Sequence, residues 1–390
     1  MSKCWVPGGG WWRTIPLAAM LFTVLSSPSL ATADPSDLWQ SLTEAGDTAR
    51  VQTHYDDAER LYLLAGHEAE QFGPGDTRVA ATLNNLGLVY HAQGQYARAK
   101  PYYEQALARW EQALGPEHAD VGSALNNLAE VYKEEGAFDL AEAAYRRSLA
   151  IGERVLGRGH PELAIGFNNL GGLYRKQGRF SQAEAQFRLA LALLSGADRT
   201  MSIDPSLVLN NLAALYKEKG LYVFAEPLYR QALSLRLERL GQHHPSIAIC
   251  LNNLGSLYHA QGLSELANRY YREALAVSES AAGPEAALTG MILVNWAWLS
   301  HKRGLAEEAK FRYQRGLVIQ QQTLGPDHPM VALTVERYAG LLSDLGQSVE
   351  ANLFAARAAA IRVQQGQSSR SPAQSRQSRS SQETQKGVKR

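Results

Sequence analysis

Apolar positions recur along most of the chain at the spacing of α-helices. In residues 80–93 the apolar side chains fall at i, i+3, i+6 and i+7, which marks one face of a helix. Gly94 follows, at a place where a helix end favours left-handed backbone. Residues 96–107 carry a second apolar face, and the LGPEH run at 114–118 ends that segment with a proline suited to a turn or a helix start. The pattern predicts a pair of helices.

This helix pair repeats with a fixed period. The stretch LNNLGLVY at 83–90 returns in closely similar form at 125–132, 167–174, 209–216 and 251–258, each time 42 residues further on. A strict period in this range is typical of stacked-repeat proteins, whose units bury a continuous core against their neighbours. Three further series share the period: glycines at 94, 136, 178, 220, 262, 304 and 346; alanines at 99, 141, 183, 225, 267, 309 and 351; and aromatic residues at 103, 145, 187, 229, 271 and 313.

A small residue, Gly or Ala, also recurs within the first helix of each unit, at 87, 129, 171, 213, 255 and 297. We expect these positions to let the second helix approach closely, with the aromatic series filling the remaining space. A bulky side chain at such a crossing would overpack it at a cost of about 1–3 kcal/mol.

The two ends of the array depart from the pattern. The first unit matches only in its second helix, through Tyr55 and Tyr62, and lacks the Asn pair. The seventh unit keeps one Asn (Asn295), and the eighth has Glu336 and Arg337 in place of both. Atypical terminal units are expected where a repeat array must seal its apolar core from water. We therefore predict an all-α right-handed superhelical solenoid of about eight antiparallel helix pairs, over residues 34–365.

The chain termini are different in kind. Lys3 and Arg13 precede a short apolar run at 15–25, and small residues lead to Ala33, which predicts a secretory signal peptide over residues 1–33 with cleavage near Ala33. An uncleaved anchor is the alternative, but the run is shorter than the roughly 20 residues that span a bilayer. Residues 366–390 form a Ser-, Gln- and Arg-rich basic segment that we expect to be disordered. The prediction is an exported protein, periplasmic or secreted, with no transmembrane segment after cleavage.

Composition narrows the function classes. The chain has 45% hydrophobic and 20% charged residues and a formal net charge of +1, so no overall field favours nucleic acid or an acidic membrane. Of the two cysteines, Cys4 lies in the predicted signal peptide, and Cys250 is then alone. An intramolecular disulfide and a cysteine zinc site are therefore excluded in the mature chain, and we expect Cys250 to be a packing residue.

The repeat resembles the tetratricopeptide repeat, in its longer kinesin-light-chain-like form. The resemblance rests on the NLGxxY or NLAxxY run of the first helix, the Gly, aromatic and Ala series that follow, and the LGPEH linker, over about residues 37–362. HEAT-type repeats have a similar period but lack this small and aromatic series. The resemblance implies a protein-binding solenoid whose first helices line a concave groove.

Motifs of common enzymes are missing: there is no GxSxG, no phosphate-binding GK[ST] loop and no HExxH. Four histidines share one repeat position, His118, His160, His244 and His328. Because equivalent positions of a solenoid lie a repeat apart, these residues cannot share a metal, and we expect them to pack against or cap the next helix. We predict no catalytic site, no metal site and no cofactor.

Two rows on the first helices are candidates for ligand contact. The resemblance implies that an Asn of the repeated pair clasps the backbone of a bound peptide; the alternative is a hydrogen bond to the neighbouring repeat. The candidates are the first Asn of each pair, Asn84, Asn126, Asn168, Asn210 and Asn252.

Seven residues further on, every repeat carries a basic residue or histidine, which favours an acidic peptide or a free C-terminal carboxylate as the ligand. The alternative is a solvated helix end. This row is His91, Lys133, Arg175, Lys217, His259 and His301.

These features predict a non-catalytic scaffold or adaptor that binds an extended peptide or a partner helix in its groove. The expected partners are proteins or peptides, not nucleic acid, and their identity and the oligomeric state stay open. An exported binder of an anionic cell-envelope polymer, using the basic row and the basic tail together, is the alternative.

Overall fold

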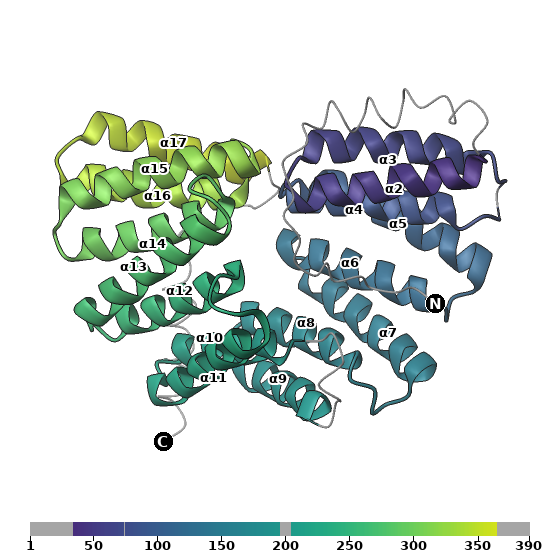
Figure 1. Cartoon of the computed structure of the whole chain (residues 1–390), viewed down its shortest axis with the longest axis horizontal. Coiled ribbons are helices and arrows are strands. Elements are labelled where there is room, and N and C mark those ends of the chain that lie inside the picture. Colours follow the sequence, from purple (N-terminus) through teal and green to yellow (C-terminus); the bar gives the residue numbers. More distant parts are fainter. Residues whose placement is uncertain (1–33, 74, 196–203, 365–390) are drawn as a thin grey trace, which may run out of the picture. The chain divides into compact units, whose positions relative to one another are not determined.

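The computed structural model describes residues 34–73, 75–195 and 204–364, and the predicted signal peptide and basic tail lie outside these ranges. The described residues form α-helices joined by short loops, without a β-strand (Figure 1). The helices are α2 (Pro35–Val51), α3 (Tyr55–Glu70), α4 (Arg78–Ala92), α5 (Tyr96–Leu114), α6 (Ala119–Glu135), α7 (Phe138–Leu156), α8 (Leu163–Lys176), α9 (Phe180–Ser195), α10 (Pro205–Glu218), α11 (Tyr222–Leu240), α12 (Pro245–Ala260), α13 (Ser264–Ala281), α14 (Ala287–Lys302), α15 (Ala306–Leu324), α16 (Pro329–Asp344) and α17 (Ser348–Gln364).

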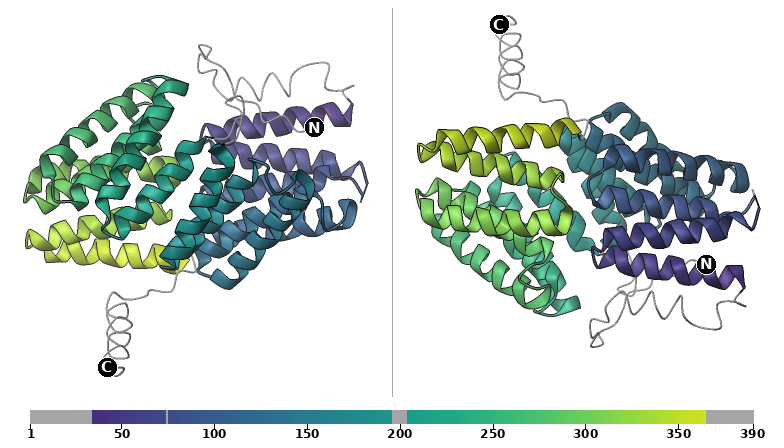
Figure 2. Two further views of the ribbon diagram at one scale, coloured as in Figure 1. Left: turned by 90° about the horizontal axis from the view of Figure 1, so that it is seen from below. Right: turned by 90° about the horizontal axis from the view of Figure 1, so that it is seen from above.

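Consecutive helices form eight pairs in the described part of the chain, as the repeat predicts. We call the even-numbered helix of each pair its A helix and the odd-numbered one its B helix. The two helices of a pair pack against each other, and within the second part of the chain each B helix from α5 to α15 also packs against the next A helix, so that these pairs stack in chain order (Figure 2). The all-α solenoid predicted from the sequence is confirmed.

The chain divides into two compact units between Thr82 and Leu83, inside α4. In the first unit α2 packs on α3, with Gly46 against the Tyr62 ring, where an added Cβ would lie 2.7 Å from a ring carbon. Trp39 of α2 donates a hydrogen bond to the Thr82 hydroxyl, at 3.0 Å. This first pair lacks the Asn residues of the repeat but keeps its contact between a small residue and an aromatic ring.

The same contact joins the two helices within later pairs. Cβ atoms added at Gly87, Gly171 and Gly255 would lie 2.6, 2.7 and 2.8 Å from ring carbons of the aromatic residues on the following B helices. The prediction that small residues allow close approach and aromatic rings fill the space is therefore confirmed. Each A helix after the first is followed by a glycine with positive φ, as the αL end of a helix requires: Gly94, Gly136, Gly178, Gly220, Gly262, Gly304 and Gly346, with φ between 69° and 79°.

The core runs from one pair to the next. In one cluster Tyr90 of α4 and Tyr103 of α5 meet Leu128 and Val131 of α6. In another, residues of α14 and α15 pack with α16 and α17, including Tyr338, whose ring contacts Phe354. In the second unit the apolar core is therefore built from clusters that join each pair to its neighbour.

Three of the four linker histidines act as helix caps. Nδ1 of His118, His160, His244 and His328 accepts a hydrogen bond from the backbone N–H two residues later, at 3.1–3.3 Å. His118, His244 and His328 are the N-cap residues of α6, α12 and α16, so their bonds satisfy one of the amides that the start of a helix leaves unpaired. The bond of His160 lies ahead of α8, whose N-cap is Glu162. The predicted capping role is confirmed for these three histidines.

Candidate ligand-binding face of the A helices

The A helices expose one face each, on which residues at i, i+4 and i+7 lie in line. We call these faces, from α4 to α16, the A face. It carries the Asn pairs, the basic row seven residues after the first Asn, and a row three residues before it. All three rows have the period of the repeat, so each A helix presents the same positions.

The Asn pairs form a ladder between neighbouring A helices. The second Asn of each pair donates through Nδ2 to Oδ1 of the first Asn of the preceding pair, at 2.8–3.1 Å, in five successive steps. The donors are Asn127, Asn169, Asn211, Asn253 and Asn295, and the acceptors are Asn84, Asn126, Asn168, Asn210 and Asn252. The structure therefore shows the bond between repeats that the sequence left open as the alternative to ligand contact.

The two members of the pair differ in exposure. Asn168, Asn210 and Asn252 are buried, whereas their partners in the pair are partly exposed. Asn210 also donates to the carbonyl oxygen of Ser206, at 2.7 Å, so its amide is bonded on both sides. Contact of the first Asn with a bound peptide stays a prediction; the more accessible amide belongs to the second Asn.

The positive charges in the first half of the basic row, His91, Lys133 and Arg175, are paired with carboxylates or suppressed by burial. Lys133 of α6 forms an ion pair with Glu130 one turn earlier on the same helix. Arg175 of α8 has its Nε 3.8 Å from a carboxylate oxygen of Glu218. His91 of α4 is partly buried, and burial lowers its pKa below the usual value, which favours the neutral imidazole.

The second half of the row lines a basic hollow. Lys217 of α10 and His259 of α12 face it together with Arg337 of α16, around a volume of about 200 Å³. The other lining residues are Ser256, Ala260, Tyr271, Asn295 and Trp298, so no carboxylate is among them. We call this site the basic hollow.

Three contacts hold the cations of the basic hollow in place. The Lys217 ammonium donates to Oγ of Ser256, at 2.9 Å, and Nη1 of Arg337 donates to Oδ1 of Asn295, at 3.4 Å. The Arg337 guanidinium also lies 5.5 Å from the ring centroid of Trp298, within the range of a cation–π contact. Because serine, amide and indole carry no negative charge, the lining of the hollow is electrostatically suited to an anion.

The pKa values of His259 and Lys217 are shifted by their burial and by neighbouring charges. Burial lowers the pKa of His259, and the positive charges of Arg337, Lys217 and Lys302 lower it further. Burial also lowers the pKa of Lys217, against the attraction of Glu218. An anion in the basic hollow would oppose both effects by stabilising the charged forms.

The last member of the row differs from its neighbours. Nε2 of His301 on α14 lies 2.8 Å from the carboxylate of Asp344, so this side chain is already engaged. The ammonium of Lys302, the next residue, lies 4.3 Å from the Trp298 ring centroid. The six predicted residues therefore do not form one uniform positive stripe.

Arg337 and Trp298 are not among the residues predicted from the sequence, although the repeat register carries a signal for Arg337. It occupies the position of the second Asn in the last A helix, one period after Asn295. Its hydrogen bond to Asn295 therefore ends the Asn ladder with a guanidinium group. An arginine replacing the amide of a repeat row could have been singled out on that ground.

The comparison with protein families agrees with this geometry. The model of the tetratricopeptide repeat matches residues 78–152, 120–195 and 204–280, together half of the chain. The chain belongs to the tetratricopeptide repeat family. Proteins of this family generally bind other proteins, and their scaffold is generally non-catalytic. No curated protein sequence matches the chain.

Several solved structures are similar to this one. BtubC (BKLC) from P. vanneervenii is 26% identical, with a TM-score of 0.50, over 58% of this chain and 91% of that one. The apo form of RapI is 15% identical, with a TM-score of 0.53, over 73% and 97% of the two chains, and shares the fold. A putative kinesin light chain with TPR-like repeats from Podosopora anserina is 22% identical, with a TM-score of 0.43, over 52% and 95%.

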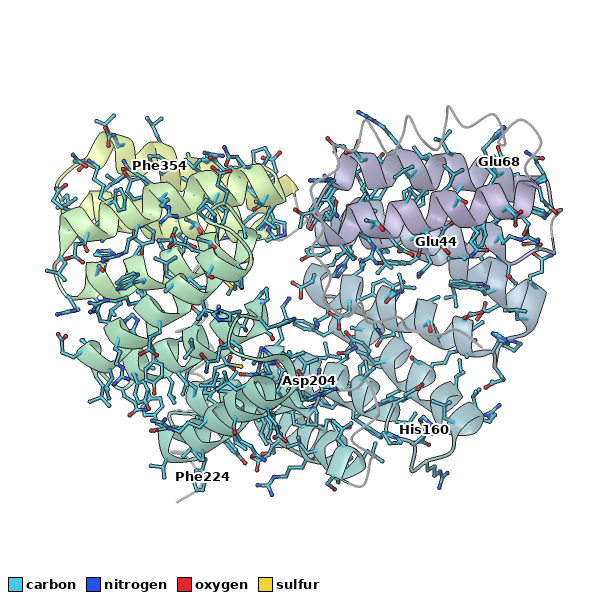
Figure 3. The ribbon with its side chains drawn as sticks, viewed as in Figure 1. Glu44, Glu68, His160, Asp204, Phe224 and Phe354 are labelled. Atoms are coloured by element: carbon cyan, nitrogen blue, oxygen red, sulfur yellow. The ribbon has the colours of Figure 1, made fainter. Side chains whose placement is uncertain are left out.

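One buried polar cluster of this tetratricopeptide repeat protein lies behind the Asn ladder, where Asn210 donates to the Ser206 carbonyl oxygen and to the Cys250 sulfur. Arg236 of α11 pairs with Asp204, at 3.3 Å, and donates to Ser206 and to the sulfur of Cys250 (Asp204 is labelled in Figure 3). Burial raises the pKa of the Cys250 thiol, which disfavours the nucleophilic thiolate. Cys250 is buried as expected, although in a partly polar environment. Within the described ranges no three His, Cys, Asp or Glu residues are placed to hold a metal ion.

Proposed function

We propose that the protein is an exported, non-catalytic scaffold that binds an acidic segment of a partner protein on the A face of α10, α12, α14 and α16. The observation that carries this proposal is the basic hollow, in which Lys217, His259 and Arg337 converge without a carboxylate among the lining residues. An acidic side chain or a terminal carboxylate would supply the missing negative charge, and a guanidinium group can bind a carboxylate through two parallel hydrogen bonds.

The Asn ladder supports the same proposal by a different route. Its hydrogen bonds hold the side-chain amide of the second Asn of each pair in position before any ligand binds. Ligand binding therefore costs less conformational entropy at these side chains. Asn211, Asn253 and Asn295 stay partly exposed on the helices that form the basic hollow, and Asn295 lines it. An exposed amide can pair with the polar groups of a ligand whatever its side chains. The ladder would then add affinity, and the basic hollow would add selectivity for acidic ligands.

The competing proposal, an anionic cell-envelope polymer, requires positive charge along the whole row. Glu130 pairs with Lys133, and Glu218 lies beside Arg175, so the charge is interrupted before the basic hollow. A discrete acidic segment needs only the local cluster. The interruption favours a protein partner over a long polymer.

Export and the basic tail remain part of the proposal on sequence grounds alone. Residues 1–33 carry the pattern of a cleaved signal peptide, and residues 366–390 carry a basic, low-complexity composition. Within the described ranges, no helix combines the length and hydropathy that a membrane span requires. The mature chain to be tested therefore runs from residue 34 to residue 390.

The test is affinity capture from the exported fraction with this mature chain as bait. A second bait carries Lys217→Glu and Arg337→Glu, and a control bait carries Arg269→Glu, an exposed arginine of the B helix α13. We expect the wild-type and control baits to capture the same protein and the double variant to lose it, and a peptide array of that protein to bind through acidic segments. Capture of the same protein by all three baits would contradict the proposal. So would binding only to an anionic polymer.

A further inference from the structure

A row of exposed aliphatic side chains crosses the first turns of the A helices. Ile165, Leu207, Ile249 and Leu333 are 50%, 50%, 36% and 43% exposed, and Met291 between them is partly exposed. These five residues are exactly one period apart and come from α8, α10, α12, α14 and α16. We call them the aliphatic row. Exposed apolar residues scattered singly need no explanation, but a row on one shared face indicates a binding surface.

The aliphatic row is confined to one part of the array. The same position is Ala81 in α4 and Ser123 in α6, so the row begins only at Ile165. Ile165 borders a mainly apolar hollow of about 360 Å³ between α6, α7 and α8, lined also by Leu149 and Leu163. The row therefore has an apolar hollow at its start, and beyond it runs along the same helices as the basic hollow.

On α8, α10, α12 and α14 the aliphatic and the basic positions lie ten residues apart, as in Leu207 and Lys217. On α16 the cation is Arg337, four residues after Leu333. At a rise of about 1.5 Å per residue, the two rows are separated by roughly 15 Å along the helix axis. The partly exposed Asn211 lies between them. A helix with its side chains is about 10–12 Å across. One helix lying over the Asn ladder would therefore contact the aliphatic row with one edge and the basic row with the other.

The spacing of the A helices bears on whether the ligand is helical or extended. The Asn ladder joins neighbouring A helices directly, and helices in such contact lie about 8–10 Å apart. Seven residues of a helix rise about 10.5 Å, which is close to the upper end of this range. Residues on one face of an extended strand recur about every 6.6 Å, which is shorter than the whole range.

We propose that the occupant of this surface is an acidic amphipathic helix of the partner protein. Its aliphatic side chains, one in every seven residues, contact the aliphatic row from Leu207 to Leu333. Asp or Glu side chains along its other edge face Lys217, His259 and Arg337. This inference rests on the proposed function and adds the secondary structure and the apolar register of the ligand.

The test uses three synthetic peptides of about four heptads, of which the first two have equal composition. In the first, Leu recurs every seven residues opposite a Glu edge; in the second, the same residues are shuffled so that this register is lost. A third peptide has the first sequence with a central proline, which breaks the helix. Binding to the mature protein is measured by fluorescence anisotropy.

We expect the heptad peptide to bind at least about tenfold more tightly than the shuffled and proline peptides, a difference of about 1.4 kcal/mol. The triple variant Leu207→Ser, Ile249→Ser, Leu333→Ser should lose this advantage. Val223→Ser, at a residue of the B helix α11 that is 84% exposed, should keep it. Circular dichroism and thermal unfolding of each variant establish that it is folded.

The outcomes separate this inference from the proposed function. If all three peptides bind equally and the double variant Lys217→Glu, Arg337→Glu abolishes binding, the acidic preference stands and the helical register is wrong. If the triple variant binds the heptad peptide as tightly as the wild type does, the aliphatic row is not its contact surface. If no acidic peptide binds, both the helix and the acidic preference are overturned.

Discussion

The A face has two parts that share one scaffold and differ in chemistry. The ladder of Asn side chains runs unchanged from Asn84 to Asn295. On α4 and α6 it is flanked by small side chains and by a lysine paired with Glu130. From α10 to α16 it is flanked by the aliphatic row and by the cations of the basic hollow, whose lining contains no carboxylate.

This difference separates the positions that maintain the repeat from those that are free to vary. The small residues, the rings and the Asn ladder are needed wherever one pair packs on the next, so they recur throughout. The exposed rows contribute little to stacking and can differ between the two parts. We therefore expect ligand contacts to be concentrated from α10 to α16, where the exposed rows carry aliphatic side chains and cations.

The largest expected effect is on binding of an acidic ligand. Lys217→Glu together with Arg337→Glu should weaken binding by about a hundredfold, because two cations of the basic hollow are replaced by like charges facing the ligand. Lys133→Glu in the neutralised part should change affinity less than about threefold. Isothermal titration calorimetry with the acidic heptad peptide measures both. Equal losses from the two parts would abolish the distinction between them.

Substitutions in the Asn ladder should lower the free energy of unfolding and leave the preference for acidic ligands unchanged. Asn252→Ala removes an acceptor that is 3% exposed and leaves the Asn295 amide without this partner, which should cost about 1–3 kcal/mol of unfolding free energy. Asn126→Ala should also destabilise, by less, because Asn126 is only partly buried. Chemical unfolding followed by circular dichroism measures both. A ladder variant that loses binding at full stability would show instead that the first Asn contacts the ligand.

Binding should depend on pH through His259. In the free protein the pKa of His259 is held below its ordinary value by burial and by Arg337, Lys217 and Lys302, and a bound anion raises it. Binding therefore takes up a proton, so affinity should rise as pH falls through the bound-state pKa and level off below the free-state pKa. A difference of one pKa unit corresponds to about a tenfold gain. His259→Gln should flatten this profile; an unchanged profile would exclude His259 as its source.

The smallest expected effect is a loss of stability on removal of a capping histidine, and it should be equal in the two parts of the A face. His118→Ala and His244→Ala each remove a helix cap and should cost about 1 kcal/mol of unfolding free energy. The matched variants His118→Asp and His244→Asp keep a capping acceptor and should recover most of that stability. Thermal unfolding compares the four proteins. A loss in only one part would mean that these histidines are not equivalent.

The sequence predicted the fold because each structural requirement is written at a fixed period. Gly94 and its equivalents end the A helices, and the residue at Gly255 must be small because the Tyr271 ring lies against it. The capping role of the histidines followed from their repeat position. None of these inferences needed contacts between distant parts of the chain.

The candidate site was harder to predict because periodicity alone treats equivalent residues as alike. His91, Lys133 and Lys217 share one row, yet one is partly buried, one is paired with Glu130 and one lines the basic hollow. These differences come from side chains three or more residues away on the same helix, or on other helices. Arg337 was missed because it stands where the pattern breaks.

Site-specific photo-crosslinking of the captured complex tests the central claim most directly. The photoreactive residue is placed at Leu333 and at Ser123, equivalent positions in the two parts of the A face, and at Val223 on a B helix. The account predicts a strong crosslink to the partner from position 333, a weaker one from position 123 and none from position 223. A crosslink from position 223 with none from position 333 would contradict it.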